Sequence, residues 1–167
     1  MFKIKYVILL FLFFGFMPIT FANEVAFIDV DYLFSNSKKG KEIITILNNL
    51  NENNQNILKK KENEIIDLKN QIENQQNLLK KDELNNKIEV LNLKAKDFND
   101  LKKNLINEFE EKKNNEIKIF FNEINPLLEK YMMDNSIKII LDKKNIFLAN
   151  KEYDITPEII RIIDKSF

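Results

Sequence analysis

The stretch LLKKDELNN, Leu78 to Asn86, lies in the middle of a long segment with a helical pattern. Between Gly40 and Pro126 the chain has no glycine and no proline, so only a turn made of ordinary residues can interrupt a helix there. Apolar residues recur through this segment at spacings of mostly three and four, which is typical of a coiled-coil seam. A single helix of this length would leave that seam uncovered, so we expect the segment to fold back on itself.

The quoted stretch has the residue types of a turn between two helices. Lys80 and Lys81 suit the C-terminal end of a first helix, where cations interact favourably with the helix dipole. Asp82 can cap the N-terminus of a second helix. The sequence therefore predicts an antiparallel helical hairpin, or arm, over residues 37–131, with its tip near residues 80–82.

Reflecting the sequence about this turn brings apolar residues opposite one another. The predicted pairs are Leu79 with Leu84, Ile72 with Leu91, Ile65 with Phe98, and Leu58 with Leu105. The same reflection places Asn54 opposite Phe109. Lys61 falls near Leu101. Because polar residues in a seam reduce the stability of a coiled coil, we expect a partial seam to hold the arm together.

The segments that flank the arm have the residue types of β-strands. Their β-branched and aromatic content predicts strands at residues 24–30, 137–141 and 146–149. The turn DKKN joins the last two into a hairpin. We expect this C-terminal hairpin to pair with the N-terminal strand and to close a small sheet at the base of the arm.

Several residues in the flanks signal where helices begin or bend. Asp31 is expected to cap a short helical turn, and Ser37 to cap the first long helix. Thr156 followed by Pro157 predicts the start of a last short helix, because proline fits the first turn of a helix. Pro126 is expected to kink the second long helix where it reaches the base of the arm.

The expected β-body, residues 23–36 and 132–167, is too short to be stable by itself. Domains of this size usually need disulfides, metals or partners, and the chain has no cysteine. The predicted fold is therefore α+β, with a long antiparallel coiled-coil hairpin on a small β-sheet body that oligomerises. The candidate residues for the oligomer core are Ile28, Val30, Ile139, Leu141, Ile146 and Leu148.

The composition argues against catalysis. The absence of cysteine and histidine excludes thiol nucleophiles, imidazole acid–base chemistry and zinc sites of the usual kind. We predict no catalytic residues, no cofactor, no metal site and no enzymatic activity. Asp29 and Asp31 lie two residues apart and could face a cation, but a hard cation needs more oxygen ligands than two carboxylates supply. Local capping is the simpler interpretation.

The N-terminus has the pattern of a secretory signal. Lys3 and Lys5 precede an apolar run over residues 7–17, and small residues follow it. We therefore predict a signal peptide over residues 1–22, cleaved before Asn23. The alternative is a retained membrane anchor, although a membrane span needs about 20 apolar residues.

Three parts of the chain follow one another in a distinctive order. They are VAFIDVDYLFSNSKKGK at residues 25–41, a long charged segment without glycine or proline, and IKIILDKKNIFLANKEYDITPEII at residues 137–160. In this order the chain resembles the Skp (OmpH-like) family of periplasmic chaperones. The resemblance implies a jellyfish-like homotrimer in the periplasm, whose arms enclose a cavity and hold unfolded outer-membrane proteins without ATP. The alternative is a structural coiled-coil spacer or adaptor of the cell envelope.

Five aliphatic residues of the arm lie off the predicted seam and are candidates for client binding. They are Ile66, Val90, Leu93, Ile106 and Ile119. They are either ordinary scattered surface residues or a surface that a trimer would repeat around its cavity. Residues 38–134 contain 18 lysines and 18 acidic residues, so long-range attraction is not expected to bring clients in. Lys80 and Lys81 are weaker candidates for contact with client, membrane or lipopolysaccharide, and no nucleic-acid partner is expected.

Overall fold

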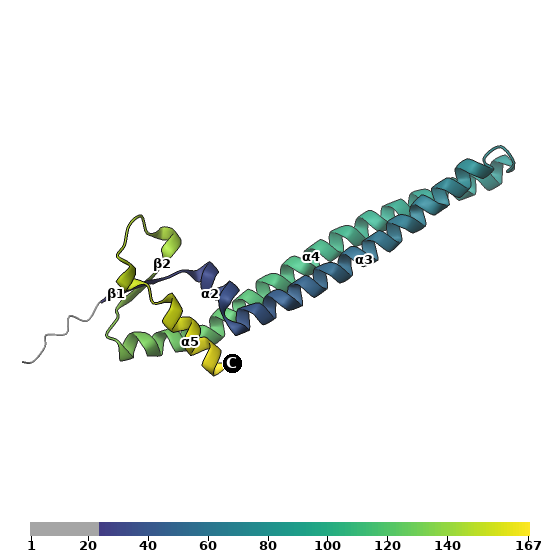
Figure 1. The fold of residues 1–167 in the computed structure, drawn as a ribbon. Helices are drawn as coiled ribbons and strands as arrows, with labels where there is room; N and C mark the ends of the chain where they lie inside the picture. The colour runs from purple at the N-terminus through teal and green to yellow at the C-terminus, as the bar shows by residue number, and fades with distance from the viewer. Residues whose placement is uncertain (1–23) are drawn as a thin grey trace, which may run out of the picture.

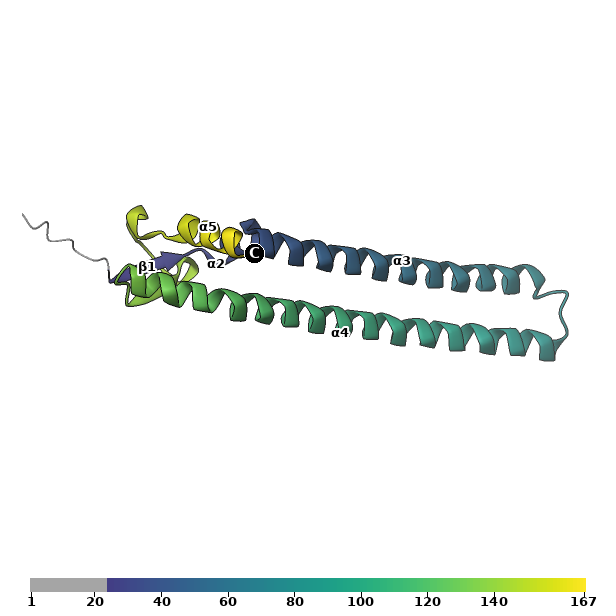
Figure 2. The same cartoon turned by 90° about the horizontal axis from the view of Figure 1, so that it is seen from below.

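The computed structural model describes residues 24–167, so the predicted signal peptide lies outside the described part of the chain. Two long helices, α3 (Lys38–Gln75) and α4 (Lys81–Asp134), run antiparallel and form an arm that projects from a small body (Figures 1 and 2). The predicted helical hairpin is therefore confirmed. Within residues 24–167, no helix combines the length and apolar character that a membrane crossing requires.

The turn at the tip of the arm lies slightly earlier in the chain than the sequence indicated. It occupies residues 76–80, between the end of α3 and the start of α4. Lys80 stands at the N-cap position of α4, and Lys81 is the first residue of that helix. The expectation that these lysines end the first helix and that Asp82 caps the second was wrong. Asp82 instead lies in the first turn of α4, where a negative charge is favourable beside the helix dipole.

The register between the two long helices follows the predicted reflection. Ile65 and Phe98 line one cavity between α3 and α4. Leu58 and Leu105 line a second cavity, together with Asn54 and Phe109. The predicted pairing is confirmed at these positions, although the turn itself is not centred on the axis of reflection.

The body contains a two-stranded parallel sheet of β1 (Val25–Ile28) and β2 (Ile139–Asp142). Val25 lies opposite Ile139, and Ile28 lies opposite Asp142. Parallel strands cannot be joined by a tight turn and need a long crossover connection. Here the whole arm is that connection, which explains why the chain leaves the body after β1 and α2 and returns directly into β2.

The C-terminal hairpin predicted from the sequence does not form. After β2 come two short 3₁₀ helices, η1 (Lys143–Asn145) and η2 (Lys151–Tyr153), and residues 146–149 between them are not a strand. The next contact with the sheet is a parallel bridge between Phe27 and Asp154, where the Ile155 N–H donates to the Phe27 carbonyl at 3.0 Å. The β-branched and aromatic content of residues 146–149 was therefore misleading, because strand formation also requires a pairing partner.

The hydrophobic core of the body combines its own elements with the roots of the arm. Helices α2 (Val30–Asn36) and α5 (Thr156–Ser166) pack beside the sheet. The largest fully buried apolar side chains are Leu33, Ile43, Phe120, Ile124, Ile159 and Ile163. Because α3 supplies Ile43 and α4 supplies Phe120 and Ile124, the arm and the body are packed as one unit at this end. Helix α4 changes direction near the body (Figure 1), and Pro126 lies within this helix.

Hydrogen bonds from side chains fix the starts of the helices. Asp29, and not Asp31 as expected, caps α2 by accepting from the Tyr32 N–H at 3.0 Å. Ser37 caps α3 as predicted and accepts from the Gly40 N–H at 3.2 Å. Helix α5 begins at Thr156, also as predicted. The Thr156 hydroxyl accepts from the Asp29 N–H at 2.8 Å, which ties the start of α5 to the end of β1.

Gly40 allows α2 and α3 to approach closely. A Cβ atom at this position would lie 1.6 Å from the carbonyl oxygen of Phe34, far inside van der Waals contact. Glycine is required here because the side chain of any other residue would clash with the backbone of the preceding helix.

Candidate functional site

The arm carries the aliphatic residues that the sequence singled out, and all five are exposed. Their exposed fractions run from 37% for Ile119 to 54% for Leu93. The five are Ile66, Val90, Leu93, Ile106 and Ile119. The seam residues beside them are more deeply covered, so these side chains are available to a partner along most of the length of the arm.

The five exposed aliphatic residues do not lie on one face of the arm. Each residue turns an α-helix by about 100°, so a residue that precedes a seam position lies on the opposite flank from one that follows it. Val90 and Ile119 each precede a seam residue of α4, whereas Ile106 follows one. Ile66 follows a seam residue on the antiparallel helix, which places it on the flank of Ile106. Leu93 lies midway between two seam positions and points away from α3.

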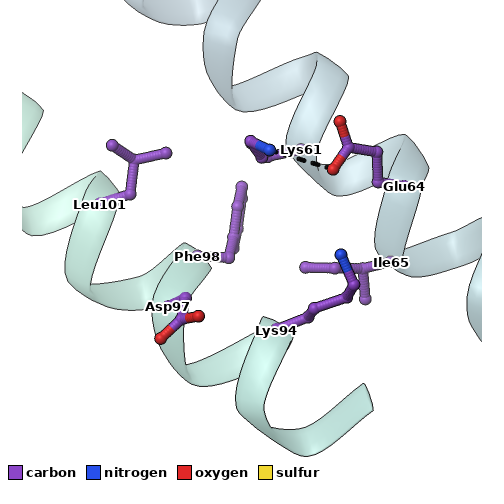
Figure 3. Close-up of a pocket in the computed structure, with 7 residues that line it drawn as sticks. All are labelled: Lys61, Glu64, Ile65, Lys94, Asp97, Phe98 and Leu101. Atoms are coloured by element: carbon purple, nitrogen blue, oxygen red, sulfur yellow. Dashed lines mark hydrogen bonds and ion pairs between the residues drawn. The ribbon is translucent and has the colours of Figure 1, made fainter. Parts of the chain in front are cut away.

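A cavity of 270 Å³ opens in the seam, in the half of the arm nearer its tip (Figure 3). Ile65, Phe98 and Leu101 give it an apolar lining. Charged residues stand around them, and Lys61 pairs with Glu64 at 3.1 Å. This cavity lies where the reflection placed a lysine near Leu101, and both Lys61 and Leu101 line it.

A second seam cavity, of 220 Å³, lies nearer the body and has an amide in its wall. Its apolar lining is Leu58, Leu105, Ile106 and Phe109, and its polar lining is Asn51, Asn54, Gln55 and Glu110. Asn54 is only 8% exposed although it is polar. The sequence indicated a weak pair at Asn54 and Phe109, but only the structure places Ile106 in the same cavity.

The tip of the arm presents an apolar residue that sequence reasoning missed. Leu78 is 85% exposed in the turn and stands close to Lys80 and Lys81, which are also exposed. Its signal in the sequence was an extra leucine beside the seam residue Leu79, directly before two lysines. A contact of the two lysines with anionic lipid, lipopolysaccharide or client stays a prediction.

The body exposes some of the residues expected in an oligomer core and buries others. Ile139 and Leu141 project from β2 with about half of their surface exposed, and Leu148 is almost fully exposed. Ile28 is buried within the chain itself, whereas Val30 and Ile146 are partly buried. Sequence reasoning missed Phe147, whose side chain is fully exposed next to Leu148.

A groove of 550 Å³ runs beside β2 on the body. Four of its lining residues are expected oligomer-core residues, namely Ile28, Val30, Ile139 and Leu141. The rest of its apolar lining is Phe121, Leu128, Met132 and Ile140. The body therefore has an apolar groove and an exposed Phe147–Leu148 pair on the same small domain.

The carboxylate of Asp29 is a structural group that joins β1 to the loop after β2. The Tyr32 N–H and the Lys143 ammonium both donate to it, and they hold the pKa of Asp29 below its usual value. The Lys143 Nζ lies 3.0 Å from Asp29 Oδ2. Within residues 24–167 no group of three or more acidic side chains is placed to hold a metal ion.

Comparison with known protein families identifies the family of this chain. The family described as outer membrane protein (OmpH-like) matches residues 24–163. The chain belongs to the OmpH-like family. No protein with a curated description matched it. A crystal structure of an OmpH-like protein from Caulobacter crescentus, described as a candidate outer membrane chaperone, matches with a TM-score of 0.80 and 16% identity. The match covers 87% of this chain and 86% of the other, and it shows that the two OmpH-like chains share a fold.

Proposed function

We propose that this OmpH-like protein is an ATP-independent periplasmic holdase, which binds unfolded outer-membrane proteins between helical arms and prevents their aggregation. Membership of the OmpH-like family supports a chaperone role, as does the similarity to a candidate outer membrane chaperone. In this proposal residues 1–22 are a signal peptide that is cleaved off. Residues 37–131 form the arm, and residues 23–36 and 132–167 form the body.

The observation that carries the proposal is the long arm with exposed aliphatic side chains on both flanks. Burial of apolar surface contributes about 0.8 kcal/mol for each methylene group, without dependence on sequence or direction. Several shallow contacts of this kind would hold an unfolded chain loosely. The balanced charge of the arm favours the same interpretation, because a neutral arm provides little field for selecting clients by charge.

The body supports assembly into a homotrimer. A two-stranded sheet is marginal by itself, and an open strand edge readily pairs with another chain. Within residues 24–167 the sheet consists of β1 and β2, and Ile139, Leu141, Phe147 and Leu148 are exposed. Burial of these side chains between subunits would give the small body the apolar contacts that it lacks, and it would place three arms around one cavity.

The proposal is tested by diluting an unfolded outer-membrane β-barrel protein from urea into buffer with or without the purified mature chain. A holdase keeps light scattering low at a chaperone concentration near that of the client, without ATP. A structural spacer, the alternative expected from the sequence, leaves the scattering unchanged. That second result would refute the holdase function.

A further inference from the structure

Three helices meet at the root of the arm, and polar contacts join them there. Helix α5 lies beside the body end of α3 in both views (Figures 1 and 2). The backbone N–H of Lys38, the first residue of α3, donates to Asp164 Oδ1 of α5 at 2.7 Å. The Lys38 ammonium donates to the Asp164 carbonyl oxygen at 3.1 Å. The last turn of α5 therefore supplies a partner to the start of α3, where N–H groups have none within their own helix.

Lys39 joins the same end of α3 to α4 and to Phe167. Its ammonium lies 2.9 Å from Glu123 Oε2, an oxygen that is buried from solvent. Within residues 24–167 no hydrogen bond of good geometry reaches this oxygen, so the ion pair with Lys39 balances its charge. The same ammonium lies 5.0 Å from the centre of the Phe167 ring, within the range of a cation–π interaction. Lys39 therefore contacts both α4 and the residue that follows α5.

The position of these contacts gives them leverage over the direction of the arm. Helix α3 has 38 residues and rises about 1.5 Å per residue, so it extends roughly 57 Å from this root. A rotation of roughly 10° at the root would therefore move the tip by about 10 Å. Burial of Ile43, Phe120 and Ile124 holds the arm against the body, but the hydrophobic effect is not directional. Hydrogen bonds have defined distances and angles, so they restrict the direction of the arm more closely.

We propose that Lys38, Lys39, Glu123, Asp164 and Phe167 form a clasp, which fixes the direction of the arm relative to the body. The clasp joins α3 to α5 through Asp164 and joins α3 to α4 through Glu123. While the clasp is closed, the arm points in one direction. When the clasp opens, the arm swings about its root and the core of the body stays packed. The inference concerns a single chain and does not depend on the holdase function.

The test measures the distance between the tip of the arm and the body within one chain. The chain has no cysteine, so Asn74→Cys near the end of α3 and Arg161→Cys on α5 provide the two sites for spin labels. Both positions are exposed and lie outside the clasp. Labelled chain is mixed with an excess of unlabelled chain before assembly. Double electron–electron resonance then reports the distribution of distances within one chain.

The clasp is opened by combining Asp164→Ala with Glu123→Gln. The natural chain should give a narrow distribution of distances, and this double variant should give one that is wider by about 5–10 Å, as the length of α3 implies. Glu116→Gln is the matched control. It is the same substitution on the same helix, but the ion pair of Glu116 with Lys112 lies within α4 and joins no other element. Its distribution should be as narrow as that of the natural chain.

Circular dichroism and the unfolding midpoint are recorded for each variant, and distances are measured well below the midpoint. An unchanged width in the double variant, with or without a lower midpoint, would assign these residues to stability alone and overturn the proposal. If the double variant does not fold, Phe167→Ala takes its place, because Phe167 is half exposed and its loss leaves the core intact. Phe167→Ala should widen the distribution by a smaller amount, and an unchanged width would overturn the proposal in the same way.

Discussion

Replacement of Gly40 by alanine tests the packing of α2 against α3, because two effects of opposite sign compete. In an exposed helix interior, alanine is favoured over glycine by about 1 kcal/mol. At Gly40 the new Cβ would lie 1.6 Å from the Phe34 carbonyl oxygen, which is a backbone atom and cannot move without α2. Overpacking in a close-packed region costs about 1–3 kcal/mol, or more where backbone must shift. We therefore expect Gly40→Ala to destabilise the protein.

The measurement for Gly40→Ala is the midpoint of thermal unfolding, followed by circular dichroism. A net loss of about 1–2 kcal/mol lowers the midpoint by roughly 2–8 °C in a chain of this size. The neighbouring exposed Lys41→Ala is the control and should change the midpoint little. A midpoint for Gly40→Ala equal to or above that of the natural chain would show that helix propensity outweighs the clash, and it would refute the close approach of α2 and α3.

Three further predictions concern the arm, the assembly and the body. The two flanks of the arm can be separated by Ile66→Ser with Ile106→Ser on one flank and Val90→Ser with Ile119→Ser on the other. We expect one pair of substitutions to weaken client binding several-fold more than the other pair, at unchanged helix content. Client binding by the natural chain should persist at about 0.5 M salt, where exposed charges are screened. Equal binding by both variants and the natural chain would contradict this use of the arm. For the assembly, sedimentation should give three times the subunit mass. Leu141→Asp should lower that mass without unfolding the chain, because Leu141 is partly exposed in the single subunit, and an unchanged mass would argue against β2 as an interface. For the body, the lowered pKa of Asp29 means that its charge stabilises the fold above the ordinary aspartate pKa of about 3.9 and that this contribution is lost as the pH falls through the lowered value. The unfolding midpoint of the natural chain should exceed that of Asp29→Asn at pH 6, and the difference between the two midpoints should shrink toward pH 2. A difference that does not change with pH would show that the charge of Asp29 does not stabilise the fold.

The arm could be predicted from the sequence because its determinants are periodic and local. Apolar residues every three or four positions predict a seam. Because no glycine or proline interrupts the segment, two long helices that fold back on each other are the simplest structure that covers this seam. The same periodicity predicted that Ile65 would face Phe98 and that Leu58 would face Leu105. The Ser37 cap and the start of α5 at Thr156 were also predictable, because a cap depends on residues within one turn of the helix.

Sequence reasoning failed where the structure depends on residues far apart in the chain. Residues 146–149 have the composition of a strand, but β-structure requires a partner, and β1 pairs instead with β2 and touches Asp154. The turn at the tip was misplaced because any of several ordinary residues can reverse the chain, so the local preferences of Lys80 to Asp82 were outweighed by the packing of the long helices.

The candidate site divides in the same way. Periodicity alone showed that Ile66, Val90, Leu93, Ile106 and Ile119 lie off the seam, and their exposure agrees with it. Their distribution over two flanks, the place of Ile106 in a cavity wall and the low exposure of Asn54 depend on how α3 and α4 meet in three dimensions. The physical reason is that a helical pattern specifies which residues face a partner helix, whereas the space left between two helices depends on the volumes of side chains that are some fifty residues apart.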